Sequence, residues 1–380
     1  MRTKALVLAV VSAAVAAAGA SAVTRGSMSA TARVAACTSG QIGFMGPITG
    51  PAASLGKEQL NWARFAIASF DKPNRTHFTL LQGDTQLNPK LAVTVAKKFA
   101  ANSSLLATIG PAGSQEAMTV GPTFQRAAMP YVSSLATHVP LAQGRYPTFS
   151  RVVGSDAAQA KSDALFMVNK LHVRKVVVVD DQEPYSTGLA VSATAVLKAN
   201  GVKVQRESIS QVATDFSSLV ARIAVDADVV FLPWQVAANG QLFANEMKKQ
   251  GKTAKILGSD GLDSAEFTEA GAYVSSFARD IHGLPGTKRI IAAYDGKYGA
   301  DWGMFGPPTY VAAQVIATAY KAACADGAAT RAELLRNIRA VRLPHSILGT
   351  PISFDRHGDV PTAKFYVYVI NSDGKRRLVG

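Results

Sequence analysis

The segment LLATIGPAGSQE, residues 105–116, joins an apolar strand-like run to a loop of small residues that opens a helical pattern. An earlier segment, QIGFMGPITGPAASLG at residues 41–56, repeats this order of strand, small-residue loop and helix. In a parallel α/β sheet such loops lie at the carboxyl ends of the strands, where ligands bind. The loop before Ser114 also places N–H groups and a hydroxyl at a helix N-terminus, which favours an anion. The two segments therefore predict a binding site for a ligand that carries a carboxylate.

The alternation of strand and helix continues in two successive sets. The first set has predicted strands at 42–45, 78–82, 105–109 and 129–133, with helices at 58–70 and 89–101. The second has strands at 175–180, 202–209, 228–232 and 255–258, with helices at 186–200 and 215–225. The run Val176-Val177-Val178-Val179 is apolar without alternation, as in strands buried on both faces. Because each set has the size of one doubly wound sheet, the predicted fold class is α/β with two doubly wound parallel-sheet lobes.

The last part of the chain has a different pattern. Helices are predicted at 308–325 and 331–340, the second with Thr330 as its N-cap. Residues 351–354, a turn at 355–359 and alternation over 364–370 predict a terminal hairpin added to one lobe.

The first residues have the pattern of a secretory signal. Arg2 and Lys4 precede an apolar core at 5–18 and a small-residue cleavage site at 20–22. The alternative of a membrane anchor is disfavoured because the core is short and rich in alanine. We therefore expect a signal peptide at 1–22, a linker at 23–36, and export to the periplasm or the outer face of the cytoplasmic membrane.

The chain is basic, with a formal net charge of +14 at pH 7. Its Lys and Arg residues are scattered, and the one tight cluster, at 375–377, lacks the interleaved aromatic residues of a nucleic-acid platform. The pattern predicts a solvated basic surface rather than a nucleic-acid-binding protein.

The two cysteines allow two interpretations. Val34-Ala35-Ala36-Cys37 resembles a lipobox, after which bacterial lipoproteins carry lipid, but the polar stretch 24–33 separates it from the apolar core. In an exported protein two cysteines more often form a disulfide, here between Cys37 and Cys324. The sequence favours the disulfide and leaves lipidation of Cys37 open.

From residue 41 to about residue 375 the chain resembles the leucine/isoleucine/valine-type periplasmic binding proteins, the substrate receptors of branched-chain amino acid ABC importers. Each matching segment is short, and their order and spacing make the set specific. They are residues 42–56, 84–90, 109–114, 136–137, 147–151, 181–190, 214–217, 258–261, 348–355 and 358–359.

The resemblance implies two lobes joined by three crossovers, a type 1 periplasmic binding protein fold that closes on its ligand. It places residues 37–153 and 284–347 in lobe 1, and residues 154–283 and 348–380 in lobe 2. It also implies a pocket in which Ser114 and Thr137 hold the ligand α-carboxylate, with a backbone contact at Leu135. Asp260 would pair with the α-ammonium. Tyr185 and Trp234 would form walls, with Gln235 as the alternative to Trp234.

The physical chemistry of a zwitterion agrees with this pocket. Charges taken from water lose several kcal/mol each unless they are paired, and hydroxyls at a helix N-terminus and an opposing carboxylate supply the pairing. This chain has Leu55 where the family often has tyrosine, and Leu87 and Gly113 where some members have a disulfide. The expected ligand is therefore an amino acid or a related amino or amide compound, without a commitment to leucine, isoleucine or valine.

Two other classes of function are alternatives. The chain lacks the G-x-S-x-G, G-x-G-x-x-G and H-E-x-x-H motifs, and its six His residues are scattered, so an enzyme, a bound metal and a cofactor are not expected. A receptor that signals through a separate membrane protein stays open. The favoured interpretation is a monomeric binding protein that delivers its ligand to an ABC permease.

Overall fold

The computed structural model describes residues 39–300, 302–324, 327 and 329–380. These residues belong to one folded unit. The predicted signal peptide, the linker and Cys37 lie outside the described residues, so the predictions made for them remain untested, including the disulfide with Cys324. Within the described part, no helix is both long enough and apolar enough to cross a membrane.

The first sheet has five strands in the order β2-β1-β3-β4-β5, and every neighbouring pair is parallel. Its strands are β1 Ser39–Gly46, β2 His77–Asp84, β3 Leu105–Ile109, β4 Tyr131–Ser133 and β5 Phe149–Arg151. The four strands predicted from sequence in this half are β1 to β4, and β5 was not predicted.

The second sheet has seven strands in the order β14-β13-β10-β9-β8-β6-β7. They are β6 Lys175–Asp180, β7 Lys203–Ser208, β8 Val229–Leu232, β9 Lys255–Gly258, β10 Tyr273–Ser276, β13 Tyr366–Ile370 and β14 Arg376–Leu378. The neighbours from β7 to β10 are parallel, and β13 and β14 add antiparallel strands at one edge. Counted from its own first strand, the parallel part repeats the order 2-1-3-4-5 of the first sheet.

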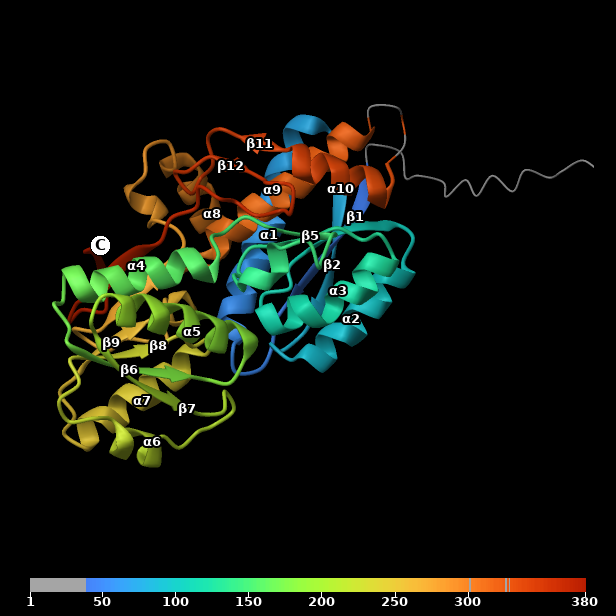
Figure 1. Ribbon diagram of the computed structural model, residues 1–380. Coiled ribbons are helices and arrows are strands. Elements are labelled where there is room, and N and C mark those ends of the chain that lie inside the picture. The colour runs from blue at the N-terminus through green and yellow to red at the C-terminus, as the bar shows by residue number, and fades with distance from the viewer. Residues whose placement is uncertain (1–38, 301, 325–326, 328) are drawn as a thin grey trace, which may run out of the picture. The chain divides into compact units, whose positions relative to one another are not determined.

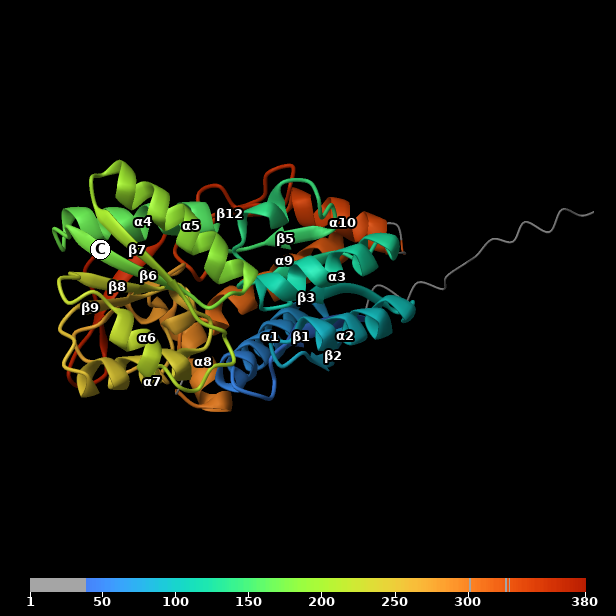
Figure 2. The same ribbon diagram turned by 60° about the horizontal axis from the view of Figure 1, so that its bottom comes forward.

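Helices cover both faces of the first sheet (Figure 1). On one face Ile42 and Phe44 of β1 pack in a cluster with residues of α1, α9 and α10, and on the other face Met45 packs with α2 and α3. Figure 2 shows α2 and α3 side by side, as Figure 1 does. The helices are α1 Ala53–Asn74, α2 Pro89–Ala101, α3 Ser114–Arg126, α9 Gly306–Ala323 and α10 Arg331–Ala340.

The second sheet is covered in the same way. Val176 and Val178 of β6 pack against α4 and α5, whereas Val177 and Val179 pack against α6 and α7 on the opposite face. The helices are α4 Asp156–Asn169, α5 Pro184–Ala199, α6 Ser217–Arg222 and α7 Ala237–Lys249. The apolar run of β6 therefore serves two cores at once, as its lack of alternation predicted.

The remaining elements are short, apart from α8 Lys288–Tyr298. They are the 3₁₀ turns η1 Val139–Ala142, η2 Asp260–Leu262 and η3 Ile281–Gly283, and the strands β11 Arg342–Leu343 and β12 Ile352–Ser353. The predicted N-cap of α10 is confirmed, because Thr330 Oγ1 accepts a hydrogen bond of 3.2 Å from the N–H of Glu333.

The predicted terminal hairpin of 351–354 with 364–370 is wrong. β12 pairs with β11 in a separate two-stranded sheet, and β13 pairs with β10 and β14. The true hairpin turn follows β13, where the N–H of Asn371 donates to the carbonyl of Lys375 over 2.8 Å and Gly374 has φ +76°. Asp359, in the segment between β12 and β13, pairs with Arg151 at the end of β5.

The lobe boundaries remain a prediction. Ile352 and Phe354, which the prediction assigns to lobe 2, pack in the same cluster as Ile42 and Phe44 of β1. We use "first lobe" below for the sheet β1–β5 with its helices, and "second lobe" for the sheet that contains β6–β10 with its helices.

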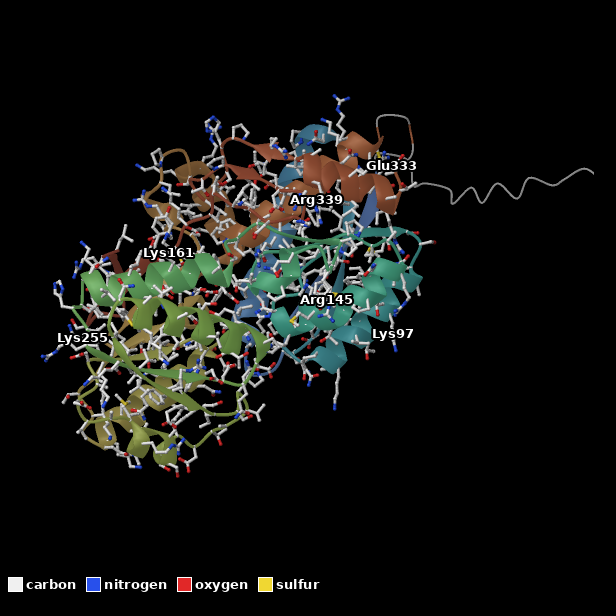
Figure 3. The ribbon with its side chains drawn as sticks, in the orientation of Figure 1. Lys97, Arg145, Lys161, Lys255, Glu333 and Arg339 are labelled. Atoms are coloured by element: carbon white, nitrogen blue, oxygen red, sulfur yellow. The ribbon has the colours of Figure 1, made fainter. Side chains whose placement is uncertain are left out.

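The basic surface is dispersed. Lys97, Lys161 and Lys255 are exposed and lie on α2, α4 and β9 respectively (Figure 3). Arg339 of α10 has a structural role instead, since its guanidinium donates to Ser150 Oγ over 3.0 Å and to the Phe149 carbonyl over 2.7 Å. It thereby fixes β5 beside α10.

Candidate functional site

One cavity lies where loops of the two lobes meet. The space that it spans, counted together with the part open to solvent, is about 270 Å³, and it is lined by Leu55, Ala112, Ser114, Leu135, Tyr185, Gln235, Asp260 and Gly261. The first four residues follow β1, β3 and β4, and the last four follow β6, β8 and β9. In each sheet these are the first, third and fourth strands along the chain. The cavity therefore lies outside the carboxyl ends of both sheets, next to the point where the strand order reverses.

Ser114 is the first residue of α3 and is buried. Its Oγ accepts a hydrogen bond of 3.2 Å from the N–H of His138, so the loops after β3 and β4 are held together. Two residues further along α3, Glu116 Oε2 accepts a hydrogen bond of 2.9 Å from the N–H of Gly113 and caps the helix. The start of α3 thus presents a hydroxyl and the positive end of the helix dipole at the cavity.

Thr137 is fully buried, and its hydroxyl has no hydrogen-bond partner within the described residues. It does not line the cavity directly. Its backbone is fixed from behind by Arg151, whose Nη1 donates to the carbonyls of Thr137 over 2.7 Å and His138 over 3.0 Å. The loop after β4 is therefore anchored to the end of β5.

Arg151 itself is fully buried and forms a bidentate pair with Asp359. Its Nε donates to Oδ1 and its Nη2 donates to Oδ2, each over 2.8 Å. The N–H of Arg151 also donates to the Gly358 carbonyl over 2.9 Å. This pair joins two chain segments far apart in sequence, directly behind the loop that carries Thr137. Sequence reasoning matched Arg151 and Asp359 to the family pattern without giving either a role.

Asp260 opens η2 after β9 and is 2% exposed. Tyr185 Oη donates a hydrogen bond of 2.6 Å to its Oδ1. Burial raises the pKa of the Asp260 carboxyl to about 7; the hydrogen bonds from Tyr185 and Gln159 act against that rise, and the charge of Asp156 adds to it. Burial, followed by the charges of Asp260 and Asp156, likewise raises the pKa of Tyr185 well above its usual range. A cation placed beside Asp260 would favour its ionised form.

Two more buried carboxyl groups lie behind Asp260, on one face of α4. Asp156 is fully buried and faces His138, with Oδ2 at 3.5 Å from Nδ1. Asp163 is also fully buried, and its Oδ2 accepts a hydrogen bond of 3.1 Å from Ser275 Oγ. Gln159 lies between them and donates to Ser275 Oγ over 2.9 Å. The interior of the second lobe beside the cavity is therefore acidic.

Trp234 does not line this cavity. It is 2% exposed, its Nε1 donates to the Val179 carbonyl over 2.8 Å, and its ring stacks on Phe216 at 5.5 Å between ring centroids. The next residue, Gln235, which the sequence offered as the alternative to Trp234, lines the cavity. Of the six predicted site residues, the structure brings Ser114, Leu135, Tyr185 and Asp260 to the cavity wall. It places Thr137 one layer behind that wall and Trp234 in the core of the second lobe.

The described residues do not suggest a metal site, since they contain no group of three or more His, Cys, Asp or Glu side chains placed to hold an ion. The cavity wall combines hydroxyl, carboxyl and amide groups with apolar side chains. Together, two doubly wound lobes and a cavity at their facing strand ends define a two-lobed α/β binding protein.

The chain belongs to the periplasmic binding protein family, whose sequence profile matches residues 39–375. This match confirms the family, the fold class and the substrate-binding role predicted from the sequence. An amino acid binding protein of Pseudomonas aeruginosa is 27% identical over 88% of this chain and 91% of its own length. A leucine-, isoleucine-, valine-, threonine- and alanine-binding protein of the same organism is 26% identical over 89% of this chain and 92% of its own length.

Solved structures share the fold. A leucine binding protein from Thermotoga maritima superimposes with a TM-score of 0.82 at 23% identity, over 90% of this chain and 97% of that protein. A solute binding protein from R. palustris in complex with benzoate superimposes with a TM-score of 0.79 at 18% identity, over 90% of this chain and 95% of that protein. Proteins of this shape therefore hold chemically different ligands, and the ligand must be argued from the cavity of this chain.

Proposed function

We propose that this protein captures an amino acid between its lobes outside the cytoplasm and delivers it to an ABC importer. The observation that carries the proposal is the opposition of two groups across one cavity. Ser114 and the start of α3 lie on one side, and the buried Asp260 with Tyr185 lies on the other. The first pair suits a carboxylate and the second suits an ammonium group.

The energetics favour a zwitterion. Each ligand charge loses several kcal/mol when it leaves water, so both need a partner in the cavity. Hydrogen bonds from Ser114 Oγ and from the first turn of α3 would meet the carboxylate, with the Thr137 hydroxyl as a further donor. Asp260 would meet the ammonium and would lose its own proton to do so, because burial raises its pKa to about 7.

The division of these groups between the lobes links binding to closure. A ligand held by only one lobe leaves one of its charges unpaired, so the closed arrangement is favoured by the full set of contacts. A closed, liganded form is what a membrane permease would distinguish from the open form. Delivery of an amino acid to an importer is supported by membership of the periplasmic binding protein family and by the relatives that bind amino acids.

We propose that this protein binds its ligand without transforming it chemically. The polar groups at the cavity are suited to holding charges, and the motifs of common hydrolases and dehydrogenases are missing from the sequence. Export follows from the predicted signal peptide at 1–22. The attachment of Cys37 to lipid and the disulfide with Cys324 are left as alternative predictions, because Cys37 lies outside the described residues.

The test is isothermal titration calorimetry on the mature protein, unfolded and refolded to remove any copurified ligand. The panel holds the twenty amino acids, their α-amides and the corresponding acids without the amino group. We expect at least one amino acid to bind with micromolar or tighter affinity, and its amide and its deamino analogue to bind much more weakly. Refolded protein that binds no amino acid would refute the proposal.

A further inference from the structure

Part of the cavity wall is left over once the two charged ends of an amino acid are assigned. Ser114, Tyr185 and Asp260 serve those ends, and the other lining residues are Leu55, Ala112, Leu135, Gln235 and Gly261. Among these five, Gln235 alone carries a polar side chain. This wall would meet the side chain of the ligand.

Gln235 is connected across the cleft to Gln115, the neighbour of Ser114 on α3. Gln235 Nε2 donates to Gln115 Oε1 over 3.3 Å. Gln115 is 3% exposed, and its Nε2 has no hydrogen-bond partner within the described residues. If both amides were turned over, the same contact would form with the roles exchanged and the Gln115 oxygen would be left instead. In either orientation one buried amide atom of Gln115 has no hydrogen-bond partner among the described residues.

The surroundings make this unsatisfied amide costly. Ala52 and Leu87 from the first lobe and Val236 from the second form an apolar cluster beside the two glutamines, and each is at most 6% exposed. A buried amide without a partner in such surroundings is unfavourable, so a ligand group that completes its hydrogen bonds gains affinity. An aliphatic side chain leaves the amide unsatisfied.

Charge near the amide pair also restricts the ligand. Glu116, next to Gln115 on α3, is fully buried; burial raises the pKa of its carboxyl to about 7, and the charges of Asp84 and Glu183 add to that rise. The residues that line the cavity include no Lys or Arg. The lining of the cavity therefore offers an acidic ligand side chain no cation to pair with.

We propose that the ligand is an amino acid with an uncharged hydrogen-bonding side chain, best matched by a carboxamide, and that Gln115 and Gln235 select it. A carboxamide offers both a donor and an acceptor, so it would pair with Gln235 in the cavity wall and would reach past it to the free amide atom of Gln115, which does not itself line the cavity. This inference rests on the proposed function and narrows it from amino acids in general to one class.

The experiment compares ligands of nearly equal shape by calorimetry on the refolded, ligand-free protein. Asparagine is set against leucine and aspartate, and glutamine is set against methionine and glutamate. We expect the better of the two carboxamides to bind at least about tenfold more tightly than its aliphatic and acidic counterparts, where tenfold corresponds to about 1.4 kcal/mol.

Two variants then test the residues. Gln115→Met and Gln235→Met keep side-chain length and remove the hydrogen bonds, and each should reduce the carboxamide-to-aliphatic ratio of affinities at least about fivefold. Gln125→Met changes an exposed residue on the same helix and should leave the ratio unchanged. If Gln115→Met and Gln235→Met both leave the carboxamide-to-aliphatic ratio of affinities unchanged, the assignment of the two glutamines is overturned.

The outcomes separate this inference from the proposed function. Leucine or methionine binding as tightly as the matched carboxamide would overturn the inference and leave the amino-acid receptor standing. If none of the amino acids in the panel binds to folded protein, both fail together.

Discussion

The two lobes are alike in topology and unlike in chemistry. Both sheets have parallel strands in the order 2-1-3-4-5, and both contribute to the cavity through the loops after their first, third and fourth strands. The first lobe offers a hydroxyl, a helix N-terminus and apolar side chains, whereas the second offers a carboxyl, a phenol and an amide. The repeated scaffold thus fixes where a ligand is held, and the loops fix which end of the ligand each lobe holds.

The lobes also differ in how their loops are supported. In the first lobe Arg151, itself held by Asp359 from the segment between β12 and β13, fixes the backbone of Thr137 and His138 by hydrogen bonds of 2.7 and 3.0 Å. In the second lobe the acidic residue that faces the cavity is itself held by Tyr185, with further buried carboxyl groups behind it. The loop support in the first lobe therefore depends on an ion pair. In the second lobe it depends on a hydrogen bond from an uncharged phenol to a buried carboxyl group.

The largest expected effect is on the stability of the first lobe. Arg151→Met leaves Asp359 without its partner and two backbone carbonyls without a donor, and breaking a buried pair in this way costs about 3–5 kcal/mol. We expect the free energy of unfolding to fall by about that amount in urea titrations. The control is Arg222→Met, which breaks the exposed pair with Glu207 and should cost less than about 1 kcal/mol. An equal loss of unfolding free energy in the two variants would contradict the claim that the buried pair stabilises the protein more than the exposed pair does.

The next largest effect is expected on ligand affinity, from a change in the second lobe. Asp260→Asn removes the proposed partner of the ammonium and should weaken amino-acid binding at least about 100-fold, or about 2.7 kcal/mol, in calorimetry. Because burial opposes ionisation of Asp260, the asparagine should not lower the melting temperature at pH 8. Asp226→Asn, an exposed change in the same lobe, is the control. Unaltered affinity would remove Asp260 from the site.

A smaller effect is expected from Ser114→Ala in the first lobe. Loss of one hydroxyl donor to a carboxylate should weaken binding by about 1–3 kcal/mol. The same variant should bind the α-amide of the ligand as well as the native protein does, because the amide lacks the charge that the hydroxyl serves. Parallel losses for both ligands would indicate that Ser114 acts only by holding the N–H of His138.

The smallest effect is the dependence of binding on pH. Burial raises the pKa of Asp260 to about 7, and only its ionised form pairs with an ammonium. Affinity should therefore be nearly constant above pH 8 and about tenfold weaker at pH 6, where about one tenth of the carboxyl is ionised. Calorimetry in buffers of different ionisation enthalpy should also show proton release on binding near pH 7. An equal pH dependence in Asp260→Asn would assign it to another group.

Much of the fold followed from local sequence pattern. The bounds of β3, β6, β9, α2 and α10 agree with the residues predicted, since apolar runs and Gly/Pro loops mark parallel strands and their ends. The short strands β5 and β10 depend on pairing with distant segments, and β13 pairs with the distant β10 as well as with its neighbour β14. The tail prediction was wrong because the partners of β12 and β13, which are β11 for the first and β10 and β14 for the second, have no signal in the local alternation of residues 351–370.

Part of the cavity was predictable because local sequence pattern marks the ends of strands. Ser114 and Asp260 directly follow strands, so the rule for carboxyl ends finds them. Trp234 and Gln235 are adjacent, and no pattern decides which of two consecutive residues faces a cleft. The packing of Trp234 on Phe216 decides it. The roles of Arg151, Asp156 and Gln115 depend on partners far away in the sequence.

The most direct test of the central claim is a crystal structure of the refolded protein with the tightest-binding amino acid of the panel. The account predicts the α-carboxylate within about 3 Å of Ser114 Oγ and of N–H groups at the start of α3, and the α-ammonium within about 3 Å of an Asp260 carboxylate oxygen. A ligand bound elsewhere, or one in this cavity with its two charged groups reversed, would contradict the division of roles between the lobes.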